Sequence, residues 1–365
     1  MDIPIYKPSI DEKESFYVNE ALTSTWISSK GKFINQFEKE FSKYTGISYS
    51  HTVTNGTVAL HLALLALGIG ENDEVIVPTL TYIASVNCIK YVGATPVFVD
   101  SDLNWQASIS DVEKKITKNT KAIIVVHLYG FAAHIKEIRE IANKYNVSLI
   151  EDCAEAIGTK VDERHVGNFS DISTFSFYGN KTITTGEGGM VCTNSEFLSK
   201  KIYLLKTQGL AKDKEYWHEI IGYNYRMTNL CAALGLAQIK KIKKFLEKKK
   251  LIFEYYKTEL SQLNLTFQKN ICSQNISSYW MICFLLEKDS QRDNLRNYLK
   301  EKGIETRPIF YPIHLMPIYK GKKGDFQNAE NIAFRGVNLP SYPDLTKKEL
   351  DYICSNIISF FKRTK

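Results

Sequence analysis

The sequence predicts an α/β protein: a mostly parallel sheet with helices on both faces, followed by a smaller C-terminal α+β domain. Short β-branched runs alternate with helical patterns through its first half, and this alternation is typical of parallel sheets. The chain has 365 residues, more than one small domain usually contains. The pattern changes after about residue 260, so we expect a large domain of residues 1–245 and a small domain of residues 246–365.

The first half supplies the elements of the parallel sheet. The expected strands are residues 74–78, 95–100, 121–127, 147–152, 173–177 and 188–193. The expected helices are residues 57–68, 84–93, 109–116 and 134–146. Continuous apolar runs of this kind are typical of strands buried on both faces. Ligands of open α/β sheets bind outside the carboxyl ends of the strands, so the residues just after each strand are the candidates for function.

The second half has a different texture. Residues 228–260 predict one long helix or two helices end to end, residues 277–287 predict a strand, and residues 293–303 and 347–363 predict helices. Residues 240–250 are rich in lysine, with apolar residues at helical spacing. We interpret this basic run as the solvated face of one helix.

Composition excludes several classes of protein. The chain is 44% hydrophobic and 24% charged, which is ordinary for a globular protein and unlike a disordered one. It has no apolar run long enough to span a membrane and no secretory signal at its start. Seven cysteines without a CxxC pair predict reduced thiols, a cytoplasmic location and no metal site. The net charge of +7 is weak evidence for an anionic ligand and does not indicate nucleic acid.

Four features point to one site. Asp152 ends an expected strand, Lys181 lies between two glycine-containing turns after another, and Tyr82 follows a third. Residues 54–57 precede a helix with small and hydroxylated side chains. Each has an ordinary alternative: a helix cap for the aspartate and for residues 54–57, a solvated lysine, or a packed tyrosine.

Together these features are the parts that pyridoxal phosphate needs. A lysine forms a Schiff base with its aldehyde, and a carboxylate holds its pyridine nitrogen protonated. A helix N-terminus binds the phosphate, and an aromatic ring covers the pyridine ring. Competing phosphate motifs are missing from the sequence, since there is no G-x-x-x-x-G-K-[ST] and residues 68–70 end a helix instead of opening one.

Several blocks carry a family resemblance, among them TNGTVALHLAL, LIEDCAEAIGT, STFSFYGNKTITTGEGGM and YNYRMTNLCAALGLAQ. Over nearly its whole length the sequence resembles the DegT/DnrJ/EryC1/StrS sugar aminotransferases, which are fold type I pyridoxal phosphate enzymes. The resemblance implies a homodimer with shared active sites, L-glutamate as amino donor and a nucleotide-linked sugar as acceptor. It implies neither a nucleic acid nor a membrane as partner.

The resemblance also implies roles for individual residues. Lys181 would carry pyridoxal 5'-phosphate as an internal aldimine and move the proton, and Asp152 would pair with the pyridine nitrogen. Glu155 stands near the ring oxygen, at a position that often holds Gln in the family, and Tyr82 would stack on the ring. The residues implied to hold the phosphate are Gly56, Thr57, Ser176 and, across a dimer interface, Asn229.

The implied reaction places an amine on C4 of a 4-keto-6-deoxy sugar nucleotide, with GDP-4-keto-6-deoxy-D-mannose as the first choice. Lysine at position 181 favours transamination, because related enzymes with histidine there dehydrate their substrates. The candidate substrate contacts are Trp26, Ser29, Lys30, Arg226, Tyr311 and His314. Simple packing is the alternative for Trp26 and Tyr311, and a satisfied buried histidine for His314.

Three alternatives remain open from the sequence. The same chemistry could act on a UDP- or dTDP-linked sugar, since neither spacing nor charge selects the base. A non-catalytic regulator that binds the cofactor is disfavoured, because no helix-turn-helix domain fits before residue 30. A plain nucleotide-binding interaction protein would be colourless, whereas bound pyridoxal phosphate absorbs visible light.

Overall fold

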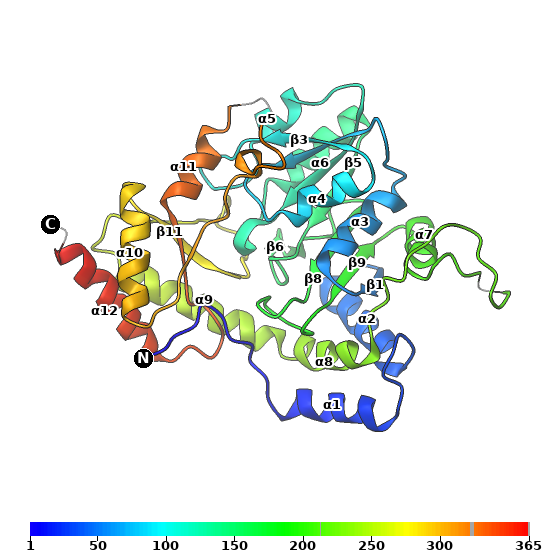
Figure 1. Cartoon of the computed structure of the whole chain (residues 1–365), viewed down its shortest axis with the longest axis horizontal. Helices are drawn as coiled ribbons and strands as arrows, with labels where there is room; N and C mark the ends of the chain where they lie inside the picture. The colour runs from blue at the N-terminus through cyan, green and yellow to red at the C-terminus, as the bar shows by residue number, and fades with distance from the viewer. Residues whose placement is uncertain (212, 322–324, 364–365) are drawn as a thin grey trace.

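The structure is a computed structural model that describes residues 1–211, 213–321 and 325–363. Its centre is a seven-stranded sheet of order β1-β9-β8-β5-β4-β2-β3 (Figure 1). The strands are β1 (Tyr49–Val53), β2 (Glu74–Pro78), β3 (Thr95–Val99), β4 (Thr120–Val126), β5 (Ser148–Asp152), β8 (Ile172–Ser176) and β9 (Gly189–Thr193). Strands β3, β2, β4, β5 and β8 are parallel, and β9 is antiparallel to both of its neighbours. The predicted mostly parallel sheet is confirmed.

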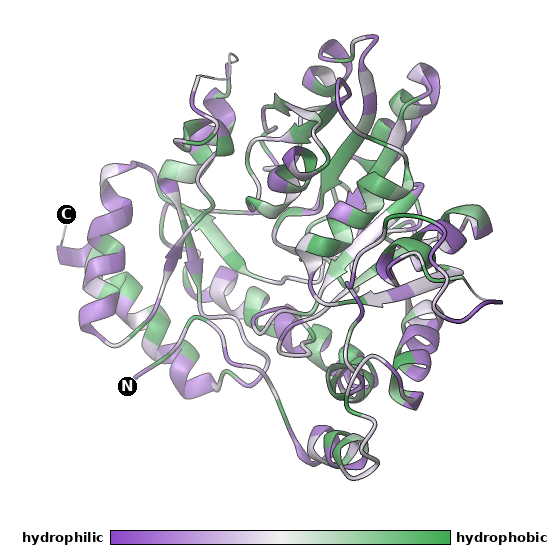
Figure 2. Ribbon diagram, turned by 45° about the vertical axis from the view of Figure 1, so that its right-hand side comes forward, coloured by the Kyte–Doolittle hydropathy of each residue, from purple (hydrophilic) through white to green (hydrophobic). Residues whose placement is uncertain are grey.

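Helices cover both faces of this sheet. The first face packs against α3 (Gly56–Ala66), α4 (Ala84–Tyr91) and α7 (Glu196–Lys206). The second packs against α2 (Lys32–Thr45), α5 (Ile109–Lys114), α6 (Ile135–Tyr145) and α8 (Asn229–Ile239). Neighbouring residues of one strand belong to different cores, since Ile124 contributes to the first and Ile123 to the second. The apolar central strands in Figure 2 therefore lie between two hydrophobic layers.

A second, antiparallel sheet has the order β10-β11-β13-β12. Its strands are β10 (Thr266–Phe267), β11 (Ile282–Leu285), β12 (Arg307–Pro308) and β13 (Gly336–Leu339). The helices α9 (Ile242–Glu259), α10 (Ser290–Glu301) and α12 (Lys347–Arg363) share a third core with it. This is the small α+β unit expected after the parallel sheet.

Helix α9 joins the two parts. It is continuous across residue 245, with Phe245 in a core of the large sheet and Ile252 in the core of the small one. The first residues also pack far from their neighbours in sequence, because Ile3 pairs with Ile304 in the small part. The predicted domain boundary at residue 245 thus falls inside a helix. The N-terminal segment packs against the small part of the molecule.

Several elements were not predicted. Strand β1 is polar and lies at the edge of the sheet, so it lacks the apolar run that marks the central strands. The helices that the sequence analysis did not predict are α1 (Glu12–Thr23), α2, α7 and α11 (Gln327–Arg335). Of the strand expected at residues 277–287, only β11 (Ile282–Leu285) forms. Residues 228–260 form two helices end to end, α8 and α9. Short elements complete the fold: β6 (Lys160–Val161), β7 (Arg164–His165) and the 3-10 turns η1 (Leu128–Gly130) and η2 (Ile313–Leu315).

The basic run corrects one interpretation. Lys243, Lys244 and Lys250 are exposed as expected, but Lys241 and Lys249 are buried. Lys241 pairs with Glu14 of α1 at 2.5 Å. The interpretation of the basic run as one solvated face was wrong, because the N-terminal segment covers α9 on one side and the small sheet covers it on another. Across the described ranges, no helix combines the length and the apolarity that a membrane crossing requires.

Candidate active site

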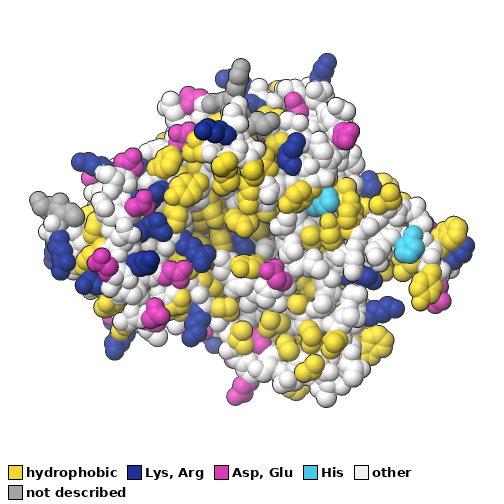
Figure 3. Space-filling model, in the orientation of Figure 1, with side chains coloured by type: hydrophobic (Ala, Val, Ile, Leu, Met, Phe, Trp, Pro, Cys, Tyr) yellow, Lys and Arg dark blue, Asp and Glu magenta, His cyan; other side chains and the backbone are white. Residues whose placement is uncertain are grey.

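A cavity of about 800 Å³ lies at the carboxyl ends of the parallel strands. All the predicted cofactor-binding residues except Asn229 line it: Gly56, Thr57, Tyr82, Asp152, Glu155, Ser176 and Lys181. Residues of the small part close it from the opposite side, among them Trp280, Arg307 and Asn338. Figure 3 shows this face hollowed near its centre, with hydrophobic side chains gathered around the hollow.

The order of the strands brings the helix N-terminus to Ser176. Gly189 of β9 pairs with Val53 of β1 on one side and with Ser176 of β8 on the other, so β1 and β8 end at the same level on either side of β9. A Cβ on Gly56 would lie 2.9 Å from the Cβ of Ser176, which shows how closely the two segments approach. The Asn55 side chain accepts the N–H of Val58 at 3.0 Å and caps α3. The first N–H groups of α3 and the Ser176 hydroxyl thus form an anion-binding corner.

Asp152 faces the cavity because strand residues alternate between the two faces. Its Oδ2 accepts a hydrogen bond from Ser85 Oγ at 2.7 Å, and its Oδ1 accepts one from the Ala154 N–H at 3.0 Å. Ser85 lies in the first turn of α4 and is buried. Two donors from different segments therefore hold this carboxylate in one orientation.

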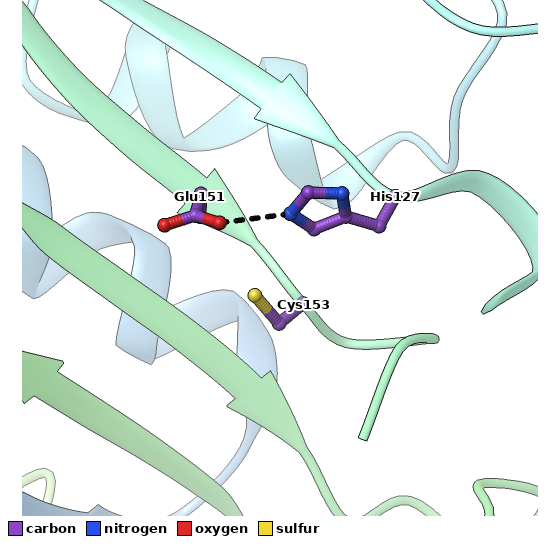
Figure 4. Close-up of side chains that lie close together, drawn as sticks. All are labelled: His127, Glu151 and Cys153. Carbon is purple, nitrogen blue, oxygen red and sulfur yellow. Dashed lines mark hydrogen bonds and ion pairs between the residues drawn. The ribbon is translucent and has the colours of Figure 1, made fainter. Parts of the chain in front are cut away.

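Glu151 and Cys153, the neighbours of Asp152 in the sequence, lie close to His127 (Figure 4). Glu151 accepts hydrogen bonds from His127 Nε2 at 3.1 Å and from the Gly167 N–H at 2.7 Å. His127 Nδ1 accepts the N–H of Ala133 at 3.1 Å, so Nε2 carries the proton. The donor atoms of His127, Glu151 and Cys153 lie within 4.8 Å of one another, but hydrogen bonds already use both imidazole nitrogens. These hydrogen bonds fix the end of β5 on the face of the sheet opposite the cavity.

Lys181 follows β8 and is held between a ring and a carboxylate. Its Nζ lies 3.8 Å from the centroid of the Trp280 ring and 3.8 Å from Glu155 Oε1. Burial lowers the pKa of Lys181, although Glu155 and Asp152 act in the opposite direction. Burial likewise raises the pKa of Glu155 to about 7, against the effect of Lys181. Burial thus favours the neutral amine, which is the form that attacks an aldehyde.

Glu155 is fixed by a strained turn. The N–H of Tyr129 donates to Glu155 Oε2 at 2.6 Å. Tyr129 has a φ of 56°, in the left-handed region that non-glycine residues rarely adopt. Its hydroxyl accepts the N–H of Phe310 at 3.0 Å. The turn after β4 thus presents a backbone donor to the Glu155 carboxylate.

The backbone of the Lys181 loop is held from distant parts of the chain. Trp280 Nε1 donates to the Asn180 carbonyl at 2.7 Å, and the Tyr6 hydroxyl donates to the Lys181 carbonyl at 2.7 Å. Sequence reasoning missed both residues, and also Ser85, because their partners are far away in the chain. Tyr82, which the sequence singled out, lines the cavity, where its ring centroid lies 5.7 Å from that of Phe310.

The remaining predicted residues lie outside the lining of this cavity. Asn229 Nδ2 donates to the Trp26 carbonyl at 2.7 Å, and its Oδ1 accepts the N–H of Phe33 at 3.0 Å. His314 contacts Thr79 Oγ1 at 2.7 Å and Glu330 Oε1 at 3.0 Å. The other predicted substrate contacts are also absent from the lining of this cavity: Trp26, Ser29, Lys30, Arg226 and Tyr311. Their roles toward substrate stay predictions.

The cavity fits pyridoxal phosphate. It combines an anion-binding corner, an oriented carboxylate and a buried amine along one edge of the sheet. Two buried polar atoms at its wall, Thr174 Oγ1 and Asn180 Oδ1, have no hydrogen-bond partner within the described chain. Buried polar groups are normally satisfied, so these two are consistent with a polar ligand that completes the site.

Fold and site together are those of a pyridoxal phosphate-dependent transaminase. The chain belongs to the DegT/DnrJ/EryC1/StrS aminotransferase family, whose model matches residues 8–358. It is 54% identical to GDP-perosamine synthase of Escherichia coli O157:H7 over 98% of each chain. It is 47% identical to GDP-perosamine synthase of Vibrio cholerae, over 98% of this chain and 99% of the relative. The solved PLP-form of Spr1654 from Streptococcus pneumoniae matches with a TM-score of 0.94 and 27% identity, covering 100% of both chains.

The Glu155–Lys181 pair leads to a prediction about the cofactor-free protein. Glu155→Gln removes the negative charge that raises the pKa of Lys181, so more of the amine is neutral at pH 7. We expect the midpoint of Lys181 acylation against pH to fall by about one unit. The rate is measured by acetic anhydride labelling and mass spectrometry of the peptide that contains Lys181.

Glu137→Gln, an exposed change on α6, is the matched control and should leave the midpoint unchanged. A midpoint that stays or rises in Glu155→Gln would show that the carboxylate does not govern the charge of this amine.

Proposed function

We propose that this protein transfers an amino group from L-glutamate to C4 of GDP-4-keto-6-deoxy-D-mannose and so forms GDP-perosamine for a surface polysaccharide such as O-antigen. The observation that carries the proposal is the placement of Lys181 and Asp152 in one cavity of a chain that is 54% identical to the Escherichia coli GDP-perosamine synthase. The family supports the amino transfer, and the names of the two relatives support this sugar.

We assign the cofactor contacts to residues of the cavity. Bound pyridoxal phosphate supplies an aldehyde that links to amines and a ring that accepts electrons. Asp152 would hold the proton on the ring nitrogen, and Tyr82 would cover one face of the ring. The anion-binding corner of Gly56, Thr57 and Ser176 would bind the phosphate.

Lys181 is the proton carrier in this proposal. Its amine is nearly buried, and burial lowers its pKa, which favours the neutral form that can accept a proton. Trp280 on one side and Glu155 on the other limit the positions of Nζ. A confined amine delivers its proton to a neighbouring carbon more efficiently than a mobile one, because the reacting geometry is already set.

The donor and the acceptor use this cavity in turn. L-Glutamate would give its amino group to the bound cofactor and leave as 2-oxoglutarate. The keto sugar would then accept this amino group at C4. A shared cavity of about 800 Å³ is large enough for part of a sugar nucleotide at one time, so we infer ping-pong kinetics.

Arg307 is our candidate for the diphosphate. Lys181 and Arg307 are the basic side chains among the described residues that line the cavity. Arg307 lies on β12, about half exposed, and contacts Glu305 at 3.4 Å. An arginine at the mouth of a cavity can bind phosphate oxygens through two parallel hydrogen bonds.

A second copy of the chain would complete the assembly. The described residues that follow position 212, between α7 and α8, project from the body in Figure 1 and carry apolar side chains that are widely exposed. Tyr216 and Ile221 are 91% and 90% exposed, and Trp217 is 53% exposed. Exposed apolar groups of this size are typical of a surface that another protein covers. We propose that a homodimer buries them. The role of Asn229 toward the partner's cofactor rests on the family resemblance, since its side-chain amide is bonded to Trp26 and Phe33.

The function is tested with the holoenzyme, L-glutamate and the GDP-, UDP- and dTDP-linked 4-keto-6-deoxy sugars. We expect turnover with the GDP-linked mannose derivative to exceed that with the others by at least about tenfold in kcat/KM, the effect of one favourable contact. Lys181→Ala should abolish turnover and the visible absorbance of the bound cofactor, because no amine remains to hold the aldehyde.

Preference for a UDP- or dTDP-linked sugar would contradict the assignment of the GDP-linked substrate and indicate a viosamine-type product. It would leave the assignment as an aminotransferase unchanged. An active Lys181→Ala enzyme would remove this lysine from the mechanism, and a colourless protein that turns over no donor would remove the aminotransferase.

Arg307→Gln should raise KM for the sugar nucleotide by about tenfold, because one charge-assisted hydrogen-bond partner of the diphosphate is lost. The rate of the half-reaction with L-glutamate, followed by stopped-flow absorbance, should not change. Arg296→Gln on α10 removes a charge from a helix outside the lining and is the control. A slower glutamate half-reaction would instead assign Arg307 to the donor carboxylate.

The dimer is tested by sedimentation. The protein should sediment with twice the chain mass of 41.7 kDa, and Ile221→Asp should shift it toward the monomer because a charge is costly in an apolar interface. Leu103→Asp changes a residue that is 86% exposed elsewhere on the surface and should leave the mass unchanged. A wild-type monomer would contradict the proposal.

A further inference from the structure

A second buried lysine lies behind the candidate active site. Lys249 is on α9, within the basic run, and its side chain is fully buried. A charged group that is buried normally has a partner of opposite charge. Within the described residues Lys249 forms no salt bridge with a carboxylate, and burial lowers its pKa to about 7. Its position therefore needs another explanation.

Lys249 binds main-chain carbonyls. Nζ donates to the Trp280 carbonyl at 3.0 Å and to the Ser341 carbonyl at 2.6 Å. It also lies 5.4 Å from the centroid of the Tyr6 ring, within range of a cation–π interaction. One amine thus joins α9 to three other segments: the N-terminal segment, the residues before β11, and the loop after β13.

Two of these contacts lead directly to the Lys181 loop. Trp280, whose carbonyl Lys249 binds, donates its indole N–H to the Asn180 carbonyl and presents its ring to Lys181 Nζ. Tyr6, whose ring faces Lys249, donates its hydroxyl to the Lys181 carbonyl. The two residues whose side chains bond to the backbone of residues 180–181 are therefore the ones that Lys249 contacts, Trp280 through its carbonyl and Tyr6 through its ring.

We propose that Lys249 is a positioning residue for Lys181: it fixes Trp280 and Tyr6, and these two fix the loop and the amine. The role of Lys181 in this proposal rests on the proposed function. The contacts themselves do not, because they lie within the protein and need neither cofactor nor sugar.

A buried amine suits this position for a physical reason. The carbonyls of Trp280 and Ser341 come from separate segments and need a donor, since buried polar groups without a partner are costly. An ammonium or amine on a long side chain can satisfy both and still face the Tyr6 ring. An apolar residue of the same length fills the space but satisfies neither carbonyl.

The test compares Lys249→Met with Lys250→Met, its exposed neighbour on the same helix. In the cofactor-free protein, we expect the Lys181 amide, which is bonded to the Tyr178 carbonyl at 2.9 Å, to exchange hydrogen about tenfold faster in Lys249→Met. Exchange in β4 and β5 should not change, and Lys250→Met should match the wild type throughout. Hydrogen exchange is followed by mass spectrometry of peptides.

A second variant separates this role from general stability. Tyr6→Phe keeps the ring and removes only the hydrogen bond to the Lys181 carbonyl, so it should accelerate exchange in the same loop. Combined with Lys249→Met, the effect should be smaller than the product of the single effects, because both act through one contact. Should Lys249→Met not fold, Lys249→Gln retains a donor in the same place and should show a smaller acceleration.

With cofactor bound, Lys249→Met should lower kcat about tenfold and leave KM for the sugar nucleotide unchanged, since the residue acts on the proton carrier and not on the binding of sugar. Unchanged exchange in residues 178–184, or acceleration spread equally over the large sheet, would overturn the proposal. Neither outcome affects the amino transfer, which the Lys181→Ala enzyme tests separately.

Discussion

The burial of one amine is the constraint on which the site depends. Lys181 has water on little of its surface, a ring on one side and a carboxylate on the other. Burial favours the neutral amine, and the carboxylate favours the charged one. The net effect is a pKa below that of an exposed lysine, so the neutral amine is more accessible here than on the surface.

This constraint explains why the site needs both parts of the molecule. The large sheet supplies Asp152, Glu155 and the loop of Lys181, but the ring against Nζ belongs to the segment before β11. The N-terminal segment also contributes, through the hydroxyl of Tyr6 on the Lys181 carbonyl. The continuous helix α9 fixes these pieces relative to one another, since it is packed in a core of each part.

The sequence alone predicts those features that depend on local order. The parallel strands could be predicted because each is a continuous apolar run, and the residues after their carboxyl ends could then be assigned to one edge. Lys181 and Asp152 were predicted in this way, and Gly56 from the small and hydroxylated residues before a helix; all three line one cavity. The family resemblance added Glu155 and Ser176, which line it as well.

What could not be predicted depends on contacts between distant segments. Nothing in residues near Ser85 shows that its hydroxyl bonds to Asp152, and nothing near Trp280 shows that its ring lies against Lys181. The basic run illustrates the same limit: helical spacing gave one polar face, but the covering of α9 on two sides decides that Lys249 is buried. Periodicity reports how a helix is built, whereas burial depends on what packs against it. The same holds for the two carboxylates of the site. Asp152 accepts two hydrogen bonds from protein donors and is fixed in one orientation, whereas Glu155 accepts one and lies beside Lys181, and only contacts between distant segments distinguish the two.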